Sequence, residues 1–503
     1  MIKNLLFCAL YLVCAVGSAE AVCSGSSPTR TAASASRTDV NDCVTAAVSG
    51  DTINVPAGTA SWSSPISLPA SKDLAVIGAT VVTCSGTPIT CSATNNTNIT
   101  CSSGTCFTID LGATHRVSGF TLLTANNGGI GFNGNVSSSK NFRVDHNRIV
   151  SNAGWAPMQI KGGSNGVHPF GLVDNNILVD VAIHSFGTLN QWDDACGNCQ
   201  DQVWAQQTPL GNSTAVVYIE DNHFQHTAAN VNSSDSNYGG RYVFRFNNIT
   251  SGRHTVEVHG MQGENRGPQR TEVYKNSVSG LVSFSGTNFF RGGTGVIFGN
   301  RQTSAFSFGI LFTNDRSEYD EAPGNFGSVQ ECTGTAPAGI DQNTPGQQGY
   351  RCRDQVGVSH DTSLWSHGAT FGAYNQVAAP VYIWDNLTGG SPMAVDVDTI
   401  GNVSLHIRAN RDFYNQVTPF NGTVGVGVGT IAARPATCTA GVAYFATDEG
   451  EWNSRQAGPD GRLYKCTVTN TWTLFYTPFP YPHPLQSGVA GPPAPPTNLR
   501  VVP

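Results

Sequence analysis

The feature of this chain that most restricts its fold is a short pattern that recurs along much of its length. The pattern is an apolar residue, two further residues and an asparagine, usually followed by another apolar residue, as in VDHNRI (144–149), IEDNHF (219–224) and VYKNSV (273–278). Most successive asparagines are 24 to 29 residues apart, with one gap of 46 and one of 86 residues. The aligned asparagines are Asn147, Asn176, Asn222, Asn247, Asn276, Asn300, Asn386 and Asn410.

A repeat of this length predicts a stacked architecture. Each unit contains short apolar alternations that are typical of strands, separated by Gly and Asn turns. One unit of short strands cannot bury its apolar face, whereas stacked units can, with each coil hydrogen-bonded to the next. Asn tolerates left-handed turns and can bond to the backbone, so asparagines at one corner of every coil can form a ladder. The sequence therefore predicts an all-β protein, a parallel β-helix of about eight to ten coils.

The start of the repeat region predicts a cap. Residues 39–62, DVNDCVTAAVSGDTINVPAGTASW, indicate a short amphipathic helix with Asp39 as N-cap, which ends near Gly50 and is followed by a strand. Such a helix would cover the open apolar end of the first coil, because an uncovered end would pair with another chain.

The second half of the chain departs from the period twice. Residues 301–378 are rich in Gly, Asp and Gln and predict a long loop excursion over one face. Residues 434–484 alternate aromatic residues around two Cys, which predicts a small β unit that caps the far end of a β-helix spanning residues 22–433. A sugar-binding patch of exposed aromatics is the alternative interpretation of this unit. Residues 485–503 form a Pro-rich tail.

Residues 1–21 have the features of a secretory signal peptide. Lys3 gives a positive start, Leu5–Val16 is an apolar run too short to span a bilayer, and Ala19-Glu20-Ala21 fits a small-x-small cleavage site. No later segment is apolar enough to cross a membrane, so we expect a secreted protein without membrane contact.

Cysteine usage agrees with export. Two of the 14 Cys lie in the predicted signal, which leaves an even number suited to an oxidising compartment. Cys196-Gly-Asn-Cys199 could also be a redox or metal pair, although a loop disulfide is favoured in an exported chain. The expected pairs are Cys23–Cys43, Cys84–Cys91, Cys101–Cys106, Cys196–Cys199, Cys332–Cys352 and Cys438–Cys466.

The charge balance restricts the class of partner. Only 12% of the chain is Asp, Glu, Lys or Arg, and the formal net charge is −7. This argues against nucleic acid as the main partner. A polyanionic sugar is still compatible, since a local basic groove can occur on an acidic protein. We expect a polysaccharide partner and a monomeric protein.

Ionisable residues are concentrated in HTVEVHGMQGENRGPQRTEVYKN, residues 254–276. With Val256 and Val258 pointing into the core, strand alternation directs Glu257 and His259 outward. Equivalent positions of stacked coils lie about 4.8 Å apart, so such a face forms a row that a linear polymer can follow. A solvated loop with weak ion pairs is the alternative.

The segment VFRFNNITSGRHTVEVHGMQGENRGPQRTEVYKN (243–276) resembles the family one pectate lyases, in which an apolar-His-Asn strand precedes an Arg-x-Pro-x-x-Arg motif and a His-x-Tyr-Asn-Asn corner. The resemblance, roughly over residues 35–415, includes the GDTINVPAGT opening and implies a right-handed parallel β-helix. It also implies Arg266 as catalytic base and Arg270 as a substrate-gripping residue, although the Arg motif is one residue shorter here and Glu272 replaces the corner His. NFRVDHNRI resembles the family's Ile-Asp-His signature at Asp145 and His146.

The resemblance implies a polysaccharide lyase that cleaves a uronate-containing polymer by β-elimination. The reaction removes the proton next to a carboxylate, so it needs a base within reach and a cation for the developing charge. Arg is a poor base because its pKa exceeds about 12, whereas His has a suitable pKa. The candidate bases are Arg266 and His259. The candidate carboxylate-binding residues are Arg241, Arg245, Arg270 and Arg291, and the candidate Ca²⁺ ligands are Glu220, Asp221, Glu257 and Glu264.

Two other functions fit the same architecture. A glycoside hydrolase needs two carboxyl groups roughly 5 to 10 Å apart, for which Asp193, Asp194, Asp235 and Glu257 are candidates. A non-catalytic glycan-binding or surface protein would use the β-helix as a rigid rod. Fold alone does not decide between these functions.

Overall fold

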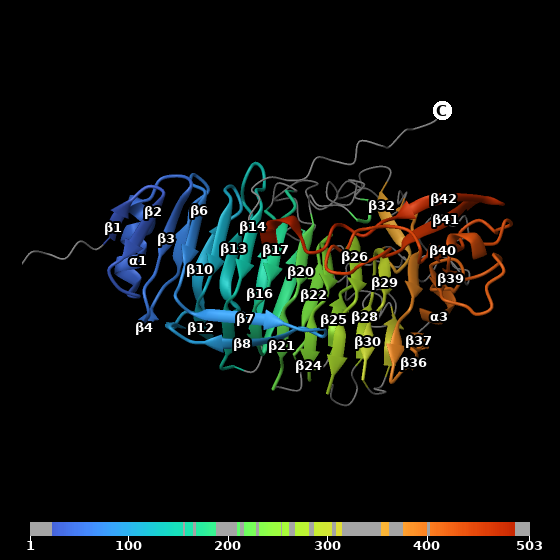
Figure 1. Cartoon of the computed structure of the whole chain (residues 1–503), viewed down its shortest axis with the longest axis horizontal. Coiled ribbons are helices and arrows are strands. Elements are labelled where there is room, and N and C mark those ends of the chain that lie inside the picture. The colour runs from blue at the N-terminus through green and yellow to red at the C-terminus, as the bar shows by residue number, and fades with distance from the viewer. Residues whose placement is uncertain are drawn as a thin grey trace, which may run out of the picture.

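The computed structural model describes residues 23–487 apart from 154–155, 164–166, 188–208, 212–215, 228–230, 253, 261–266, 281–285, 304–307, 314–353, 362–375 and 400–402. Within these residues the protein is all-β, with three long sheets in which nearly all strand pairs are parallel. Figure 1 shows the sheets running side by side along the long axis of the molecule.

We call these sheets I, II and III. In the described part of the chain, sheet I contains β1 (Cys23–Ser26), β2 (Thr29–Ala32), β3 (Asp51–Asn54), β6 (Leu74–Ile77), β11 (His115–Ser118), β14 (Phe142–Asp145), β17 (Gly171–Asp174), β20 (Val217–Glu220), β23 (Arg241–Arg245), β26 (Arg270–Tyr274), β29 (Thr294–Phe298), β34 (Val381–Trp384) and β38 (Phe413–Asn415), in that order. All of its pairs are parallel except β1 with β2.

Sheet II contains β4 (Gly58–Trp62), β9 (Thr97–Cys101), β12 (Thr121–Thr124), β15 (Arg148–Ser151), β18 (Ile177–Val179), β21 (His223–Gln225), β24 (Asn248–Thr250), β27 (Ser277–Ser279), β30 (Arg301–Gln302), β35 (Leu387–Thr388) and β36 (Ser391–Pro392). Sheet III contains β16 (Ala156–Lys161), β19 (Val181–Phe186), β22 (Ser234–Asn237), β25 (His254–Val258), β28 (Gly286–Phe290), β31 (Phe308–Phe312) and β37 (Val395–Val397). A smaller parallel sheet of β5 (Ile66–Leu68), β10 (Thr105–Asp110) and β13 (Gly129–Asn133) precedes it.

The chain visits the three sheets in turn. β14, β15 and β16 lie in sheets I, II and III, and β17, β18 and β19 repeat the same order one coil later. Side chains such as Val144, Ile149 and Met158 point inward and belong to one continuous apolar core. This arrangement of long parallel sheets is compatible with the parallel β-helix that the repeat predicts.

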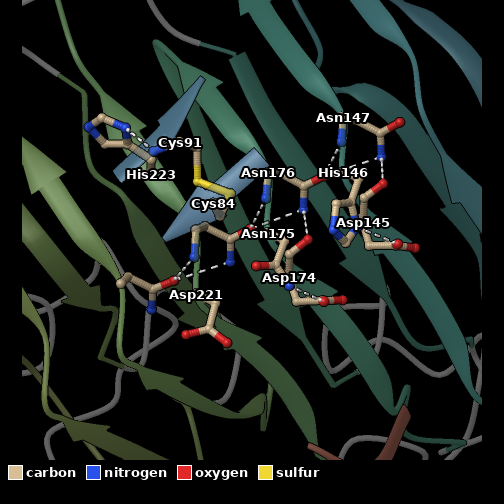
Figure 2. Close-up of a disulfide and its surroundings, with 12 residues drawn as sticks. Cys84, Cys91, Asp145, His146, Asn147, Asp174, Asn175, Asn176, Asp221 and His223 are labelled. Carbon is tan, nitrogen blue, oxygen red and sulfur yellow. Dashed lines mark hydrogen bonds and ion pairs between the residues drawn. A yellow bond between two sulfur atoms is a disulfide. The ribbon is translucent and has the colours of Figure 1, made fainter. Parts of the chain in front are cut away.

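An asparagine ladder runs along the corner between sheets I and II. The side-chain amide of each Asn but the last donates to the amide oxygen of the Asn on the next coil, at 2.8–3.2 Å, and Figure 2 shows the Asn147–Asn176 step. The backbone N–H of each of these residues, except the last, donates to the same oxygen. The members are Asn147, Asn176, Asn222, Asn247, Asn276, Asn300 and Asn386.

Two details of the predicted ladder are corrected. The left-handed turn is made by the residue before each ladder Asn, for example His146, Asp221 and Lys275 with φ of 52°, 57° and 57°. Asn410 is not a member, because it precedes its sheet I strand and accepts a hydrogen bond from the Gly425 N–H at 2.8 Å. After β38 the chain passes to another sheet, so that coil has no equivalent corner.

Helix α1 (Arg37–Ala46) lies at the N-terminal end of the sheets (Figure 1). Its N-cap is Ser36, whose hydroxyl accepts from the Asp39 N–H at 3.1 Å, so Asp39 belongs to the first turn and is not the cap. Val40, Cys43 and Val44 are buried and join the main core. The helix ends at Ala46, before Gly50.

The described part of the predicted excursion 301–378 contains strands. β30 and β31 lie within it and continue sheets II and III, because both extend the parallel pairing by another strand. β32 (Val358–Asp361) pairs antiparallel with β33 (Gln376–Ala378). An antiparallel hairpin of β7 (Val81–Ser85) and β8 (Thr90–Thr94) lies beside sheet II, where the His223 ring accepts from the Cys91 N–H (Figure 2).

The C-terminal unit is built on a sheet of β39 (Val426–Gly429), β40 (Ala443–Ala446), β41 (Arg462–Val468) and β42 (Thr471–Tyr476). It packs on the outer side of sheet I, where Tyr274, Phe298 and Trp384 form a second apolar cluster with its side chains. After β42 the chain returns along sheet I towards β17, ending in η4 (Pro484–Ser487) (Figure 1). The described residues also contain two other short helices, α3 (Val403–His406) and η3 (Ile431–Ala433).

Four disulfides join described residues, Cys23–Cys43, Cys84–Cys91, Cys101–Cys106 and Cys438–Cys466, as predicted. They indicate an oxidising environment. The pairs Cys196–Cys199 and Cys332–Cys352 and residues 1–21 lie outside the described residues. Among the helices in the described ranges, none has the length and apolarity needed to span a membrane.

Candidate functional site

The outer face of sheet III carries ionisable and aromatic side chains in two columns. Because strand residues alternate, Ile183, Val256 and Val258 enter the core while their neighbours point outward. The pairing of the strands places these outward residues in register from one coil to the next. The same register extends to His259 and Arg291, which directly follow β25 and β28. Column one contains Gln159, His184, Asp235 and Glu257, and column two contains Lys161, Phe186, Asn237, His259 and Arg291.

At the centre of this face His259 contacts Asp235 on the preceding coil. The ring Nδ1 lies 2.8 Å from Asp235 Oδ1, and the His259 side chain is 20% exposed whereas the Asp235 side chain is 5% exposed. Asp235 Oδ1 also accepts from the Ser236 N–H at 2.7 Å, which holds the carboxylate in place. A carboxylate on Nδ1 orients the imidazole and favours proton transfer at Nε2.

His184 lies beside Asp235 in column one. The two residues are paired in register, and His184 is buried. Burial lowers the pKa of His184 to about 4, against the opposing effect of the Asp235 charge. His184 is therefore neutral near neutral pH and adds a polar, uncharged group to the site.

The next ion pair on the same face joins Glu257 to Arg291 of the following coil. Asn232 also donates its side-chain amide to the other Glu257 oxygen. Glu257 is 6% exposed and Arg291 is 3% exposed. The structure therefore pairs a predicted Ca²⁺ ligand with a predicted carboxylate-binding Arg.

The other predicted arginines that the structure describes lie on sheet I and are buried. Arg245 donates to Glu220 at 2.6 Å and to the Phe479 and Pro480 carbonyls at 2.6 and 2.9 Å. Glu220 belongs to the neighbouring strand β20, whereas Phe479 and Pro480 belong to the segment after β42. Arg245 therefore docks the C-terminal segment on sheet I and is not available to a polymer at the surface.

Arg270 and Arg241 occupy adjacent strands of sheet I, one above the other. Arg270 is paired with Glu272 and donates to the Pro209 carbonyl. Burial, with a smaller effect of the Arg270 charge, lowers the pKa of Arg241 to about 9. Both side chains are about 1% exposed, so they too lie inside the molecule.

The predicted Ca²⁺ ligands Glu220 and Asp221 already bind protein donors. Glu220 accepts from the His483 N–H at 2.7 Å and from Gln486 at 2.8 Å. Asp221 accepts from the Tyr481 hydroxyl at 2.6 Å and from Gln486 at 2.8 Å. In the described part of the chain no group of three or more His, Cys, Asp or Glu side chains could hold a metal ion. Glu220 and Asp221 are thus already hydrogen-bonded to the C-terminal segment.

A second His–Asp pair lies on a different face, at the corner between sheets I and II. His146 Nδ1 lies 2.8 Å from Asp145, and the His146 side chain is 38% exposed (Figure 2). Burial alone would raise the pKa of Asp145, but hydrogen bonds from Arg116 and His146 hold it at about 2. Asp145 thus stays ionised beside its exposed histidine.

Some predicted residues lie outside the described residues: Asp193, Asp194, Glu264 and Arg266. On sheet III, sequence reasoning identified His259, Glu257 and Arg291 and considered Asp235 only for hydrolysis. It missed Lys161, His184 and Phe186. The period-two spacing of His184 and Phe186 in VAIHSF (181–186) was a signal for them.

Phe186 and Tyr238 form an aromatic pair beside the ionisable residues. Their ring centroids are 5.3 Å apart at an interplanar angle of 86°, and both side chains are partly exposed.

Comparisons of this chain with protein-family models, curated proteins and solved structures found no match.

Proposed function

We propose that this protein is a secreted polysaccharide lyase that cleaves a uronate-containing polymer on the outer face of sheet III. The observation that carries the proposal is the His259–Asp235 pair, partly exposed within two columns of ionisable side chains. The proposal includes a right-handed parallel β-helix closed at one end by α1, and export directed by residues 1–21.

In the proposed reaction His259 Nε2 takes the proton from the carbon next to the uronate carboxylate. The electrons of that C–H bond form a carbon–carbon double bond, and the bond to the neighbouring glycosidic oxygen breaks. The leaving sugar departs with that electron pair and receives a proton from the imidazolium or from water. Asp235 stabilises the imidazolium that forms, and general-base catalysis of this kind contributes about 10²–10⁴-fold.

The cation proposed to stabilise the developing negative charge is Arg291, which would act as a charge just beneath the face and not by direct contact, because only 3% of the residue is exposed. It follows His259 in column two, one strand spacing of about 4.8 Å further along the face. Its pairing with Glu257 holds the guanidinium in position. Arg266 is the second candidate base from the sequence. A Ca²⁺ requirement stays part of the proposal, and the described carboxylates offer no support for it.

A glycoside hydrolase is the second candidate, because Asp235 and Glu257 are neighbours in column one. Adjacent positions are about 4.8 Å apart, close to the roughly 5 Å separation of carboxyl groups in retaining enzymes. However, a hydrolase needs one protonated carboxyl group, and here each carboxylate is paired with a basic side chain. This pairing favours the lyase.

The product identifies the reaction. The secreted protein is incubated with polygalacturonate, alginate and glycosaminoglycans, each with Ca²⁺ and with a chelator. Unsaturated sugars that absorb in the ultraviolet support the lyase, whereas new reducing ends without this absorbance support the hydrolase. Binding without cleavage would support the glycan-binding alternative. The variants H259A and R266A then identify the base.

A further inference from the structure

Sheet III carries a lysine that the proposed reaction does not use. Lys161 is the last residue of β16 and begins column two, and its side chain is partly exposed. Within the described residues its ammonium group has no hydrogen bond or ion pair to a protein group. Arg291 in the same column is paired with Glu257. A partly buried cation without a protein anion is suited to an anionic ligand.

Aromatic side chains lie next to Lys161. Phe186 is its register partner on the following coil, and the Phe186 ring contacts the Tyr238 ring in an edge-to-face arrangement. Both rings are partly exposed on the same face. Sugar sites commonly combine an aromatic surface, which packs against the C–H groups of a sugar ring, with a few polar groups that fix its orientation.

We infer that Lys161, Phe186 and Tyr238 form a distal subsite for one uronate residue of a polymer whose cleavage occurs at His259. This inference rests on the proposed function, because it assigns an acidic sugar to the same face. Lys161 would bind the sugar carboxylate, and the two rings would support the sugar ring.

The subsite and the proposed reaction centre are separated along column two. Lys161 lies on β16 and His259 follows β25, three strand spacings away in sheet III. At about 4.8 Å per spacing this is about 14 Å. One sugar cannot bridge that distance, whereas an oligomer lying across the coils can.

The test measures binding in a background that does not cleave. Calorimetry compares H259A with H259A/K161M for a long galacturonate oligomer and for a digalacturonate, and mannuronate oligomers form a second arm. We expect K161M to weaken binding of the long oligomer by about tenfold or more, since one charge-assisted hydrogen bond is lost. Digalacturonate, which is too short to span both positions, should lose less than the long oligomer.

Three further variants act as controls. H259A/K161R keeps the charge and should retain most of the affinity, and H259A/F186L should weaken binding through the aromatic surface. H259A/K140M removes an exposed lysine outside columns one and two and should bind like H259A. Thermal unfolding checks each variant, and K161Q replaces K161M if the latter does not fold.

The inference is overturned if K161M and K140M bind the long oligomer equally well. An equal loss for both oligomer lengths would also overturn it, because Lys161 would then act at the cleavage position. If the wild type forms no unsaturated product but K161M still weakens binding of the long oligomer, the subsite stands and the proposed lyase activity fails.

Discussion

The outer faces of sheets I and III both carry ion pairs between neighbouring coils, but among the described residues only one of the two faces is covered by another part of the chain. On both faces basic side chains on one coil pair with a carboxylate on the neighbouring coil. Sheet I has Arg143 with Asp174 at 2.8 Å, and sheet III has His259 with Asp235 at 2.8 Å. On both faces the register of parallel strands brings the partners together.

The two faces differ in what covers them. Sheet I continues into a stack of Tyr274, Phe298 and Trp384, with ring centroids 4.6 and 4.4 Å apart, on which the C-terminal unit packs. Further along, Tyr481 stacks on Phe246 with centroids 3.6 Å apart. On sheet III, His259, Lys161 and Phe186 are partly exposed. The same charged pattern therefore docks a segment on one face and offers a candidate site on the other.

The largest expected effect is on sheet III. His259→Ala should lower kcat/KM for the cleaved polymer by about 10²–10⁴-fold, because the general base is lost. Its melting temperature should change little, since the side chain is partly exposed. The measurement is the initial rate of unsaturated product formation.

His146→Ala is the matched control, because it removes an exposed histidine that also contacts an aspartate, but at the corner between sheets I and II. It should keep wild-type activity. Equal losses for the two variants would contradict the assignment of the site to sheet III.

A variant on sheet I should have the opposite effect, with a loss of stability and little change in activity. Arg245→Met leaves Glu220 buried without its cation and should lower the free energy of unfolding by about 3–5 kcal/mol. Activity per folded molecule should persist at low temperature, because sheet III is unchanged. Chemical denaturation measures the free energy of unfolding, and the product assay measures the activity.

Arg301→Met is the control for this variant. Its ion pair with Asp385 is 45% and 40% exposed, so the expected cost is below about 1 kcal/mol. If both variants lost the same small amount, the buried network on sheet I would not hold the C-terminal segment as argued.

The ladder lies at the corner between sheets I and II, so a variant there should change stability alone, and by less than the loss of Arg245. Asn247→Ala removes its amide bonds to Asn276 and to the Ile219 carbonyl and should cost about 1–3 kcal/mol. Asn248→Ala, on the outward side of β24, should cost less than about 0.5 kcal/mol. Urea denaturation of the two variants measures the difference, and equal costs would count against the ladder.

The last prediction concerns acid, because its effect on stability is absent at neutral pH and develops only as the pH falls below about 6.5. Burial lowers the pKa of His226 from 6.5 to about 4, so between these values the unfolded chain binds more protons than the folded protein. The stability contribution of neutral His226 is present above pH 6.5 and is lost as the pH falls towards about 4, by up to about 1.4 kcal/mol per pH unit.

Glu220 acts in the opposite direction, because burial raises its pKa from 4.5 to about 7. A comparison of the wild type with H226Q cancels this contribution, since both chains contain Glu220. Urea denaturation at several pH values should show a weaker loss of stability in acid for H226Q. Parallel pH profiles would contradict the prediction.

Much of the architecture could be predicted because its signals are local. Apolar alternation defines which side chains enter the core, and the recurring Asn defines where the coils superimpose. Four of the predicted disulfides join residues close in the chain, the widest being Cys438–Cys466 at a separation of 28 residues. The left-handed corner was assigned to the wrong residue, because the turn needs a positive φ just before the Asn rather than at it.

The candidate site was harder to predict, because alternation separates inward from outward positions without showing what covers the outward ones. Arg245 and His259 both point outward from a strand or its end, and both were candidates. They differ in the structure because the segment after β42 folds back over Arg245.

The amino-acid sequence by itself determined the coil period, the strand alternation and the local disulfides, since each depends on residues near one another in the chain. Only the tertiary structure decided which charged columns are buried. The bond from the His483 N–H to Glu220 joins residues 263 positions apart, and no local pattern around Glu220 encodes that partner. Contact over such a separation depends on the packing of the whole C-terminal unit on sheet I.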